Sequence, residues 1–232
     1  MKGLLCYYFN VRIKYLIFPF LFQILSRLAL RPIAKFFLRY EVRGLENLKK
    51  INGNCLFVSN HIHEIDPVLF LMTLPIFAFA RPMFFVSSPK EAYNHKGWRA
   101  KLFYGGLLFH SFGARESYRG LDDYALSVKH HIKLLLEGQS VLIFPEGRYT
   151  RDGNIGHTGG GASYLAYTTK KPVLPIKLEG IWDMSFKEFF NRKRKFVVTI
   201  GEPLFYEDLF NDNFNQSREG FKQKSGEIIR RV

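Results

Sequence analysis

The sequence contains little cysteine, and its first 40 residues contain no acid. Only Cys6 and Cys55 occur in 232 residues, far apart and outside any paired motif. This excludes a disulfide-stabilised scaffold and indicates a reducing compartment. Acidic residues begin at Glu41, although the formal net charge is +14. Zinc-finger spacing and the aromatic signature of RNA-binding domains are also missing, so the charge points away from nucleic acid and toward another negative partner.

The chain also lacks a long uninterrupted apolar run. The longest early stretch without charge, residues 15–26, contains Pro19 and Gln23 and is shorter than the roughly 20 apolar residues that cross a bilayer. No small-residue cleavage site is present there, so we predict neither a spanning helix nor a signal peptide. A second uncharged stretch, residues 67–80, is also too short to span and is predicted to be a buried helix.

The N-terminal segment instead places basic residues among Leu, Ile and Phe. Its basic residues are Lys2, Arg12, Lys14, Arg27, Arg31, Lys35 and Arg39. This spacing suits an anionic membrane surface, because the apolar face enters the lipid while the cations meet the head groups. A solvated basic face is the alternative, but it does not need so many aromatic residues. We expect residues 4–38 to form one or two helices in one leaflet, and residues 1–39 to dock the protein at the cytoplasmic face of a membrane.

The remaining residues, 40–232, are predicted to form a single α/β domain. Hydrophobic residues make up 47% of the chain, which excludes disorder. Predicted strands cover 55–59, 82–87, 140–144, 172–178 and 196–200. Predicted helices cover 67–79, 97–109, 121–137 and 162–169, and the charged tail beyond Tyr206 is helical towards its end. Because strands alternate with helices, we expect a mostly parallel sheet flanked by helices.

Two polar clusters follow predicted strands, where the ligand crevice of such a sheet lies. They occupy residues 60–67 and 144–148. In the first cluster the carboxylate of Asp66 can reach back to His61 where a strand turns into a helix. That contact fixes the tautomer of the imidazole, which can then accept a proton from a substrate hydroxyl. The alternative is a surface turn in which Asp66 is only a helix N-cap.

The same cluster also allows a metal site. The run His61-x-His63, with Glu64 and Asp66, resembles the metal-binding run of a hydrolase. Such a site needs further ligands from elsewhere in the chain. The other histidines are His95, His110, His130, His131 and His157, and none of them lies in a recognisable second motif.

The two clusters together resemble a known family. The pattern Asn60-His61-x4-Asp66-Pro67, followed about eighty residues later by Phe-Pro-Glu-Gly at 144–147, is similar to the glycerolipid acyltransferases. These include 1-acylglycerol-3-phosphate and glycerol-3-phosphate acyltransferases. The resemblance extends from about residue 40 to 203, and it includes Phe-Gly-Ala-Arg at 112–115 and Val-Leu-Pro-Ile at 173–176.

The resemblance implies a role for each matching residue. His61 is the catalytic base and Asp66 its partner, while Arg115, Glu146 and Gly147 help to bind the glycerol-phosphate head group. Guanidinium groups make paired contacts to phosphate, which adds Arg148 and Arg151 to the predicted substrate-binding residues. Since a carboxylate cannot contact phosphate favourably, we expect Glu146 to orient an arginine or to accept from a glycerol hydroxyl.

The sequence departs from the family pattern at several positions. Thr-Arg is common after Glu-Gly, whereas Arg148-Tyr149 stands here, and His63 replaces a usual Ser. A run of three glycines at 159–161 is interpreted as a flexible loop into a helix, although its amides could also bind an anion.

We therefore predict an acyltransferase that moves a fatty acyl group from acyl-CoA or an acyl carrier protein to a lysophospholipid hydroxyl. The expected acceptor is 1-acyl-glycerol-3-phosphate, which gives phosphatidic acid, and no metal or further cofactor is expected. The expected partners are membrane lipid and the acyl donor, with no nucleic acid. The competing hypotheses are a metal-dependent hydrolase built on His61-x-His63 and a non-catalytic lipid-binding module.

Overall fold

A computed structural model of the chain describes residues 2–75, 82–97, 107–118 and 123–232. A seven-stranded sheet forms its centre, in the order β1-β7-β6-β2-β5-β3-β4. The strands are β1 (Glu41–Arg43), β2 (Leu56–Ser59), β3 (Met83–Ser87), β4 (Ala114–Glu116), β5 (Ser140–Ile143), β6 (Val173–Glu179) and β7 (Val197–Ile200). All neighbours are parallel except β6 and β7, which are antiparallel. The predicted mostly parallel α/β sheet is confirmed.

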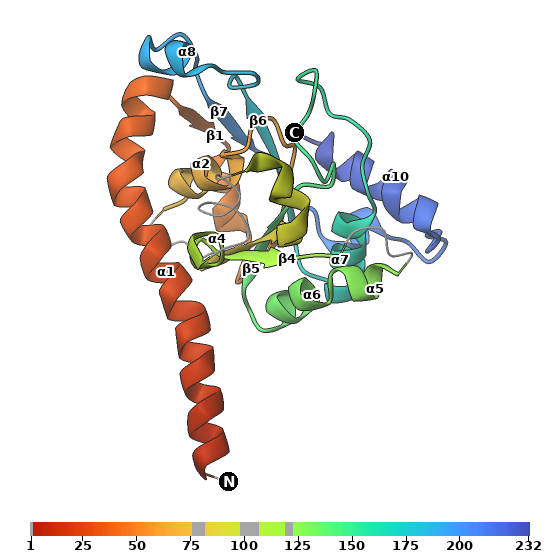
Figure 1. The fold of residues 1–232 in the computed structure, drawn as a ribbon. Coiled ribbons are helices and arrows are strands. Elements are labelled where there is room, and N and C mark those ends of the chain that lie inside the picture. The colour runs from red at the N-terminus through yellow and green to blue at the C-terminus, as the bar shows by residue number, and fades with distance from the viewer. Residues whose placement is uncertain (1, 76–81, 98–106, 119–122) are drawn as a thin grey trace.

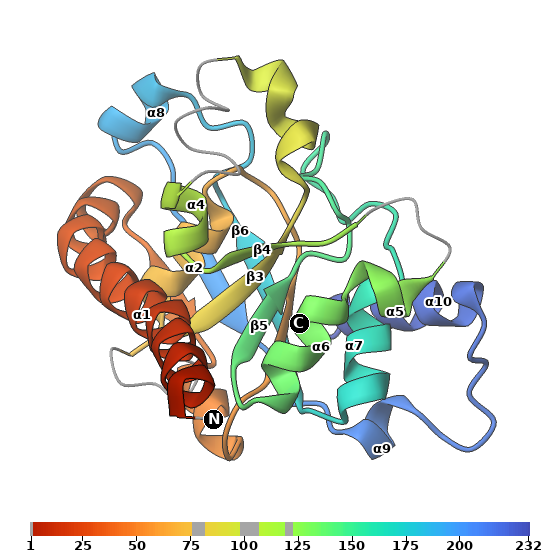
Figure 2. The same ribbon diagram turned by 60° about the horizontal axis from the view of Figure 1, so that its bottom comes forward.

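Helices cover both faces of the sheet (Figures 1 and 2). They are α1 (Lys2–Leu38), η1 (Leu45–Lys50), α2 (Asp66–Thr73), η2 (Lys90–Lys96), α4 (Leu107–Ser111), α5 (Tyr124–Ser127), α6 (Lys129–Leu136), α7 (Gly161–Thr169), α8 (Phe186–Phe190), α9 (Tyr206–Leu209) and α10 (Arg218–Ile229). One core lies between the sheet and the side that carries α1 and α2, and the other between the sheet and the side that carries α6, α7 and α10.

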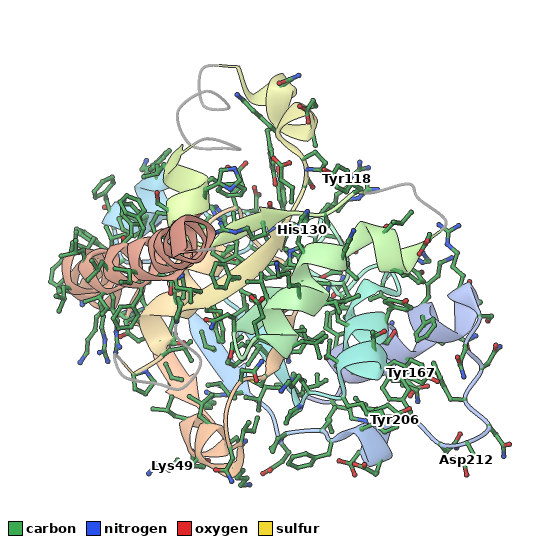
Figure 3. The ribbon with its side chains drawn as sticks, turned by 90° about the horizontal axis from the view of Figure 1, so that it is seen from below. Lys49, Tyr118, His130, Tyr167, Tyr206 and Asp212 are labelled. Atoms are coloured by element: carbon green, nitrogen blue, oxygen red, sulfur yellow. The ribbon has the colours of Figure 1, made fainter. Side chains whose placement is uncertain are left out.

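The central strands are buried on both sides, which explains their composition. All four residues of β2 and all four of β5 are buried, as expected for parallel strands covered by helices. The second core extends into an aromatic cluster, in which the ring centroids of Tyr167 on α7 and Tyr206 on α9 are 5.8 Å apart. Figure 3 shows this cluster at the side of the molecule away from α1. Strands β1 and β4 were not predicted, because three residues are too few to show a periodic pattern.

Two predicted helices end or break earlier than expected. The helix predicted for 67–79 ends at Thr73, since Leu74 is extended (φ −72°, ψ 144°) ahead of Pro75. The helix predicted for 121–137 is divided into α5 and α6 by Val128 (φ −115°, ψ 20°). Residues 76–81 and 98–106 lie outside the described residues, so the prediction for 97–109 is met only by its end, in α4.

Helix α1 is one continuous helix of 37 residues that contains Pro19 and Pro32. The prediction of one or two helices is therefore confirmed as one. The prediction that no stretch is long enough to span was too strict. By length and composition alone Leu16–Leu38 could cross a bilayer, and only 17% of its most apolar window is buried inside the protein. In Figure 1 the N-terminal part of α1 extends beyond the rest of the molecule.

Candidate active site

The candidate base lies at the carboxyl edge of the sheet, just past β2. The Nδ1 atom of His61 is 2.8 Å from Oδ2 of Asp66, the first residue of α2. The same oxygen accepts the backbone N–H groups of Ile62 (2.7 Å) and His63 (2.9 Å). Because an ionised carboxylate oxygen can only accept, Nδ1 of the neutral imidazole donates to Asp66, and Nε2 is then the acceptor. The predicted pairing of His61 with Asp66 is thus present in the structure.

The carboxylate of Asp66 is fully buried behind the imidazole. Its second oxygen, Oδ1, is also buried and has no hydrogen-bond partner in the part of the chain that the structure describes. The imidazole lies flat against Phe144, with 4.2 Å between ring centroids and 22° between planes. The ring of His61 is therefore held on one face by packing and on one edge by the carboxylate.

The strand ahead of the base is held by Asn60. Its side chain donates to the carbonyl of Leu178 (2.9 Å) and accepts from the amide of Leu178 (2.7 Å). This paired contact joins the end of β2 to the end of β6. An Asn directly before the base is therefore a positioning residue.

The loop after β5 holds the backbone of His61 from the other side. Glu146 accepts the amide of His61 at Oε1 (2.9 Å) and the amide of Gly156 at Oε2 (2.9 Å). The amide of Thr150 donates to the carbonyl of His61 (2.7 Å). Glu146 was expected to orient an arginine or a substrate hydroxyl, but its oxygens bind backbone amides and tie this loop to the base.

Gly147 occupies a position that requires glycine. It has a φ of +70°, where other residues are strained, and its amide donates to the carbonyl of Phe144 (2.9 Å) in a tight turn. The turn directs the next residues to the front of the site. Gly147 thus shapes the loop through its backbone.

A cavity of about 1010 Å³ lies in front of His61. Four of the predicted site residues from the loop after β5 line it together with His61: Glu146, Gly147, Arg148 and Arg151. The side chains of both arginines are exposed. The two polar clusters that the sequence separates by about eighty residues therefore share one cavity, because β2 and β5 are parallel neighbours.

Part of the cavity lining is apolar. The apolar lining residues include Phe85, Val86, Phe109, Val128 and Ile143. A volume of this size, lined by apolar side chains together with polar groups, suits a ligand that carries a hydrocarbon chain. The cavity can therefore hold a lipid tail next to the imidazole.

Arg115 does not share this cavity. It lies on β4 beside Val86, but it is not among the residues that line the cavity. Its guanidinium donates to the carbonyls of His110 (3.1 Å) and Ala114 (2.7 Å) and lies 4.9 Å from the ring centre of Phe84. The structure thus brings together six of the seven predicted site residues, with Asp66 behind His61, and separates the seventh.

Sequence reasoning missed several residues of the cavity. Ser87 is the last residue of β3 and Ser88 follows it, Tyr93 belongs to η2, and Arg218 and Lys222 belong to α10. The two serines could have been found, since they lie at the end of a predicted strand, near the same edge of the sheet as His61. The residues of α10 carry no such signal, because only the folded chain brings that helix to the loop after β5.

The metal hypothesis gains no support from the side-chain arrangement. Within the described ranges, no group of three or more His, Cys, Asp and Glu side chains is placed to hold a metal ion. His63 accepts a long contact from the amide of Ile65 (3.4 Å) through Nδ1, and His61 uses its Nδ1 for Asp66.

Within the run of glycines at 159–161, packing requires a glycine at position 160. A Cβ on Gly160 would come within 2.5 Å of the hydroxyl of Tyr124 and 2.8 Å of Phe221. The amide of Gly160 also donates to the Tyr124 hydroxyl (3.2 Å). The run leads into α7 as interpreted, and the loop is closely packed at Gly160, where a side chain would not fit.

The chain is similar to a known family of proteins. A family model described as Acyltransferase matches residues 39–179. The chain is 29% identical to 1-acyl-sn-glycerol-3-phosphate acyltransferase beta of Homo sapiens over 166 residues, which is 70% of this chain and 52% of that protein. It is 29% identical to 1-acyl-sn-glycerol-3-phosphate acyltransferase of Borreliella burgdorferi over 137 residues, 59% of this chain and 50% of that protein. The chain thus spans about half the length of these curated relatives.

A solved structure shares the fold. The 1-acyl-sn-glycerophosphate (LPA) acyltransferase PlsC from Thermotoga maritima superposes with a TM-score of 0.57 at 20% sequence identity. The match covers 98% of this chain and 91% of that chain. The agreement therefore includes the N-terminal helix as well as the sheet.

Proposed function

The chain belongs to the Acyltransferase family, and on this premise we propose that it transfers a fatty acyl group from a thioester to the hydroxyl of a lysophospholipid. The acceptor we propose is 1-acyl-glycerol-3-phosphate, with phosphatidic acid as the product, since the curated relatives carry that acceptor in their names. The observation that carries the proposal is the 2.8 Å contact of His61 Nδ1 with Asp66 Oδ2 at the wall of a cavity large enough for a lipid tail.

In this reaction His61 is the general base. Its Nε2 takes the proton of the acceptor hydroxyl while the oxygen attacks the thioester carbonyl carbon. The carbon–sulfur bond then breaks, and the imidazolium returns the proton to the departing thiolate. The carboxylate of Asp66 stabilises the imidazolium between these two steps, and the cavity holds the two reactants together.

The proposal needs no acyl-enzyme. Cys55 is fully buried, and burial raises the pKa of its thiol above the ordinary value. A thiol that stays protonated away from the cavity is not a nucleophile. Cys55 is therefore not the acyl carrier, and we propose direct transfer from donor to acceptor in a ternary complex.

The exposed pair Arg148 and Arg151 is proposed to bind the acceptor phosphate, since both line the cavity on the loop that also holds His61. Arg115 is left out of this assignment, because its guanidinium contacts backbone carbonyls away from the cavity wall. The donor is proposed to be acyl-CoA or an acyl carrier protein, which present the same thioester. The donor is a co-substrate, and the proposed reaction uses no metal or other cofactor.

Membrane association is proposed from the distribution of polar and apolar side chains on α1. The side that faces the domain buries Gln23 and Arg27, whereas the outer side exposes apolar residues. These residues are Ile17, Phe18, Leu21, Leu25, Leu28, Ile33 and Phe36. A helix of a water-soluble protein has the opposite arrangement. We propose that residues 1–39 dock the domain of residues 40–232 on the cytoplasmic face of a membrane, so that a lipid acceptor enters from the bilayer.

The test is acyl transfer to a panel of lysophospholipids, with products identified by mass spectrometry and free thiol followed in parallel. His61→Ala is expected to lower kcat by at least about 1000-fold, because removal of a base from a paired catalytic unit costs on this order. The protein should remain folded, since the imidazole lies at the cavity wall.

The matched control is His63→Ser, two residues away. It should retain activity within about twofold, because His63 is outside the proposed chemistry. A metal hydrolase built on His61-x-His63 would instead lose activity in both variants. Thiol release that survives in His61→Ala at the original rate would refute the assignment of the base.

A further inference from the structure

The short helix α8 exposes two large aromatic side chains. Phe186 is 84% exposed and Phe190 is 62% exposed. The helix lies in the connection between β6 and β7, outside the residues matched by the family model. Large apolar side chains gathered at one exposed place mark a surface that contacts another apolar body.

The helix that presents these side chains is firmly built. The Ser185 hydroxyl accepts from the amide of Glu188 (3.2 Å), and the Glu188 side chain accepts from the amide of Ser185 (3.0 Å). Arg194 binds the other oxygen of Glu188 at 2.8 Å. The capping box and this ion pair fix α8 against the following turn. The helix that exposes the two phenylalanines is therefore well defined.

The exposed face of α8 is continuous with that of α1. Phe37 stacks on Phe189 with 4.8 Å between centroids and meets Phe190 edge-on at 5.5 Å. The guanidinium of Arg192 lies 4.4 Å from the ring centre of Phe36. Figures 1 and 2 both place α8 beside the C-terminal end of α1. The two helices therefore form one surface of exposed apolar side chains.

Exposed cations lie on or next to the two helices. They are Lys35, Arg39, Lys187, Arg192 and Lys193. Exposed aromatic side chains together with Lys and Arg complement the boundary between acyl chains and anionic head groups. The charge therefore selects an anionic lipid surface as the partner.

The surface lies at the same edge of the sheet as the cavity. Strand β6 is parallel to β2, so the connection after β6 leaves the sheet at the edge where His61 follows β2. The ring of Trp182 in this connection lies against Gly153 of the loop after β5. A Cβ added to Gly153 would lie 3.2 Å from that ring. A membrane that contacts α8 is therefore adjacent to the loop that carries the cavity arginines.

We propose that α8 is a second membrane-docking element, which inserts Phe186 and Phe190 into the head-group region of an anionic bilayer beside α1. The insertion fixes the direction in which the cavity faces the lipid. The proposal rests on the proposed function in one respect, because orientation matters only if the acceptor is a lipid.

Insertion is tested with a fluorescent reporter that needs no catalysis. Phe186→Cys is labelled with an environment-sensitive dye in a Cys6→Ser background, since Cys55 is fully buried. Vesicles of equimolar phosphatidylcholine and phosphatidylglycerol should shift the emission to the blue and raise it about twofold or more, as the dye leaves water. The matched control is Leu136→Cys on α6, whose side chain is 61% exposed on the opposite face of the sheet. An unchanged spectrum at 186, or equal changes at both positions, would overturn the proposal.

The consequence for catalysis is tested in a second arm. Phe186→Ser/Phe190→Ser should lower kcat/KM about tenfold or more with acceptor embedded in vesicles, because each buried aromatic side chain contributes to partitioning. Activity with a short-chain, monomeric acceptor should stay unchanged, and so should both activities of Leu126→Ser/Leu136→Ser. Phe186→Ser alone gives the same comparison without touching the Phe37–Phe190 contact. Equal loss with both acceptors would show a folding defect and refute docking by α8. If the wild-type protein transfers no acyl group while the dye still reports insertion, the proposed function fails and the docking element stands.

Discussion

Two regions of the molecule depart from the ordinary distribution of side chains in opposite directions. At the catalytic edge, the polar groups of Asn60 and Asp66 are buried. On the surface of α1 and α8, large apolar side chains are exposed. Soluble proteins avoid both arrangements unless a partner compensates. The partners of the first region lie within the protein, whereas the proposed partner of the second is lipid, so each departure points to a part of the function.

The comparison is tested most strongly by removing the buried negative charge of Asp66 while keeping the shape of the side chain. In Asp66→Asn the side-chain oxygen must stay where two amides donate to it, because an amide nitrogen would meet N–H groups there. The imidazole thus keeps an acceptor at Nδ1 but loses the negative charge that stabilises its cation. We expect kcat to fall about 100- to 1000-fold with little change in the KM of either substrate. Retention of more than half of the activity would show that Asp66 only holds the turn ahead of α2, through the amides of Ile62 and His63.

A fully buried histidine outside the site shows what burial does without a carboxylate. His131 on α6 is fully buried, contacts the carbonyl of Arg115 through Nε2 (3.1 Å), and leaves Nδ1 without a hydrogen-bond partner among the described residues. Burial lowers the pKa of His131 to about 4. Because the unfolded chain binds this proton near its ordinary pKa of about 6.5, the folded state loses stability as the pH falls from there towards 4.

The expected loss is on the order of 3 kcal/mol across that window. It is measured by urea unfolding at several pH values, wild type against His131→Leu. The free energy of unfolding of the variant should decline less between about pH 6.5 and 4, because leucine binds no proton in the unfolded state. Parallel declines in the two proteins would mean that His131 does not control acid stability.

Glu146 tests whether the catalytic edge depends on its backbone ties. A glutamine at this position has one acceptor, so it can satisfy the amide of His61 or of Gly156, but not both. Glu146→Gln should lower kcat about tenfold with the protein folded, because the loop and the base are no longer held together. The comparison variant is Glu64→Gln, which removes a carboxylate from the same cavity. An equal loss in both variants would mean that negative charge, and not the two backbone contacts, is what the site requires.

These contacts also show where prediction from the sequence succeeded and failed. The strands around His61 and Glu146 could be predicted, because buried runs bounded by polar residues have a clear pattern, and parallel pairing then brings their ends together. The partners of Glu146 could not, since an amide 85 positions away leaves no trace in composition. Arg115 fitted a motif, but its direction depends on which side of the short strand β4 faces the cavity. The extent of α1 could be predicted, but its apolar span Leu16–Leu38 was missed, because charged residues interrupt the apolar run in the sequence.

The smallest expected effects lie on the buried side of α1, where two polar residues one turn apart should respond with opposite signs. Gln23 donates to the carbonyls of Met83 (2.7 Å) and Phe112 (2.8 Å) and accepts from the amide of Met83 (3.3 Å), which joins α1 to β3. Gln23→Leu leaves these groups unpaired and should destabilise the protein by about 1–3 kcal/mol.

Arg27, by contrast, buries Nε and Nη1 without hydrogen-bond partners in the described parts of the chain. Arg27→Leu should therefore leave stability unchanged or raise it by about 1 kcal/mol, because a buried cation without a partner costs free energy. Both variants are measured by thermal unfolding in the same detergent. A marked loss of stability in Arg27→Leu would show that this guanidinium has a favourable role. The polar residues on the buried side of α1 would then need an explanation of their own, apart from the exposed apolar residues on the opposite side.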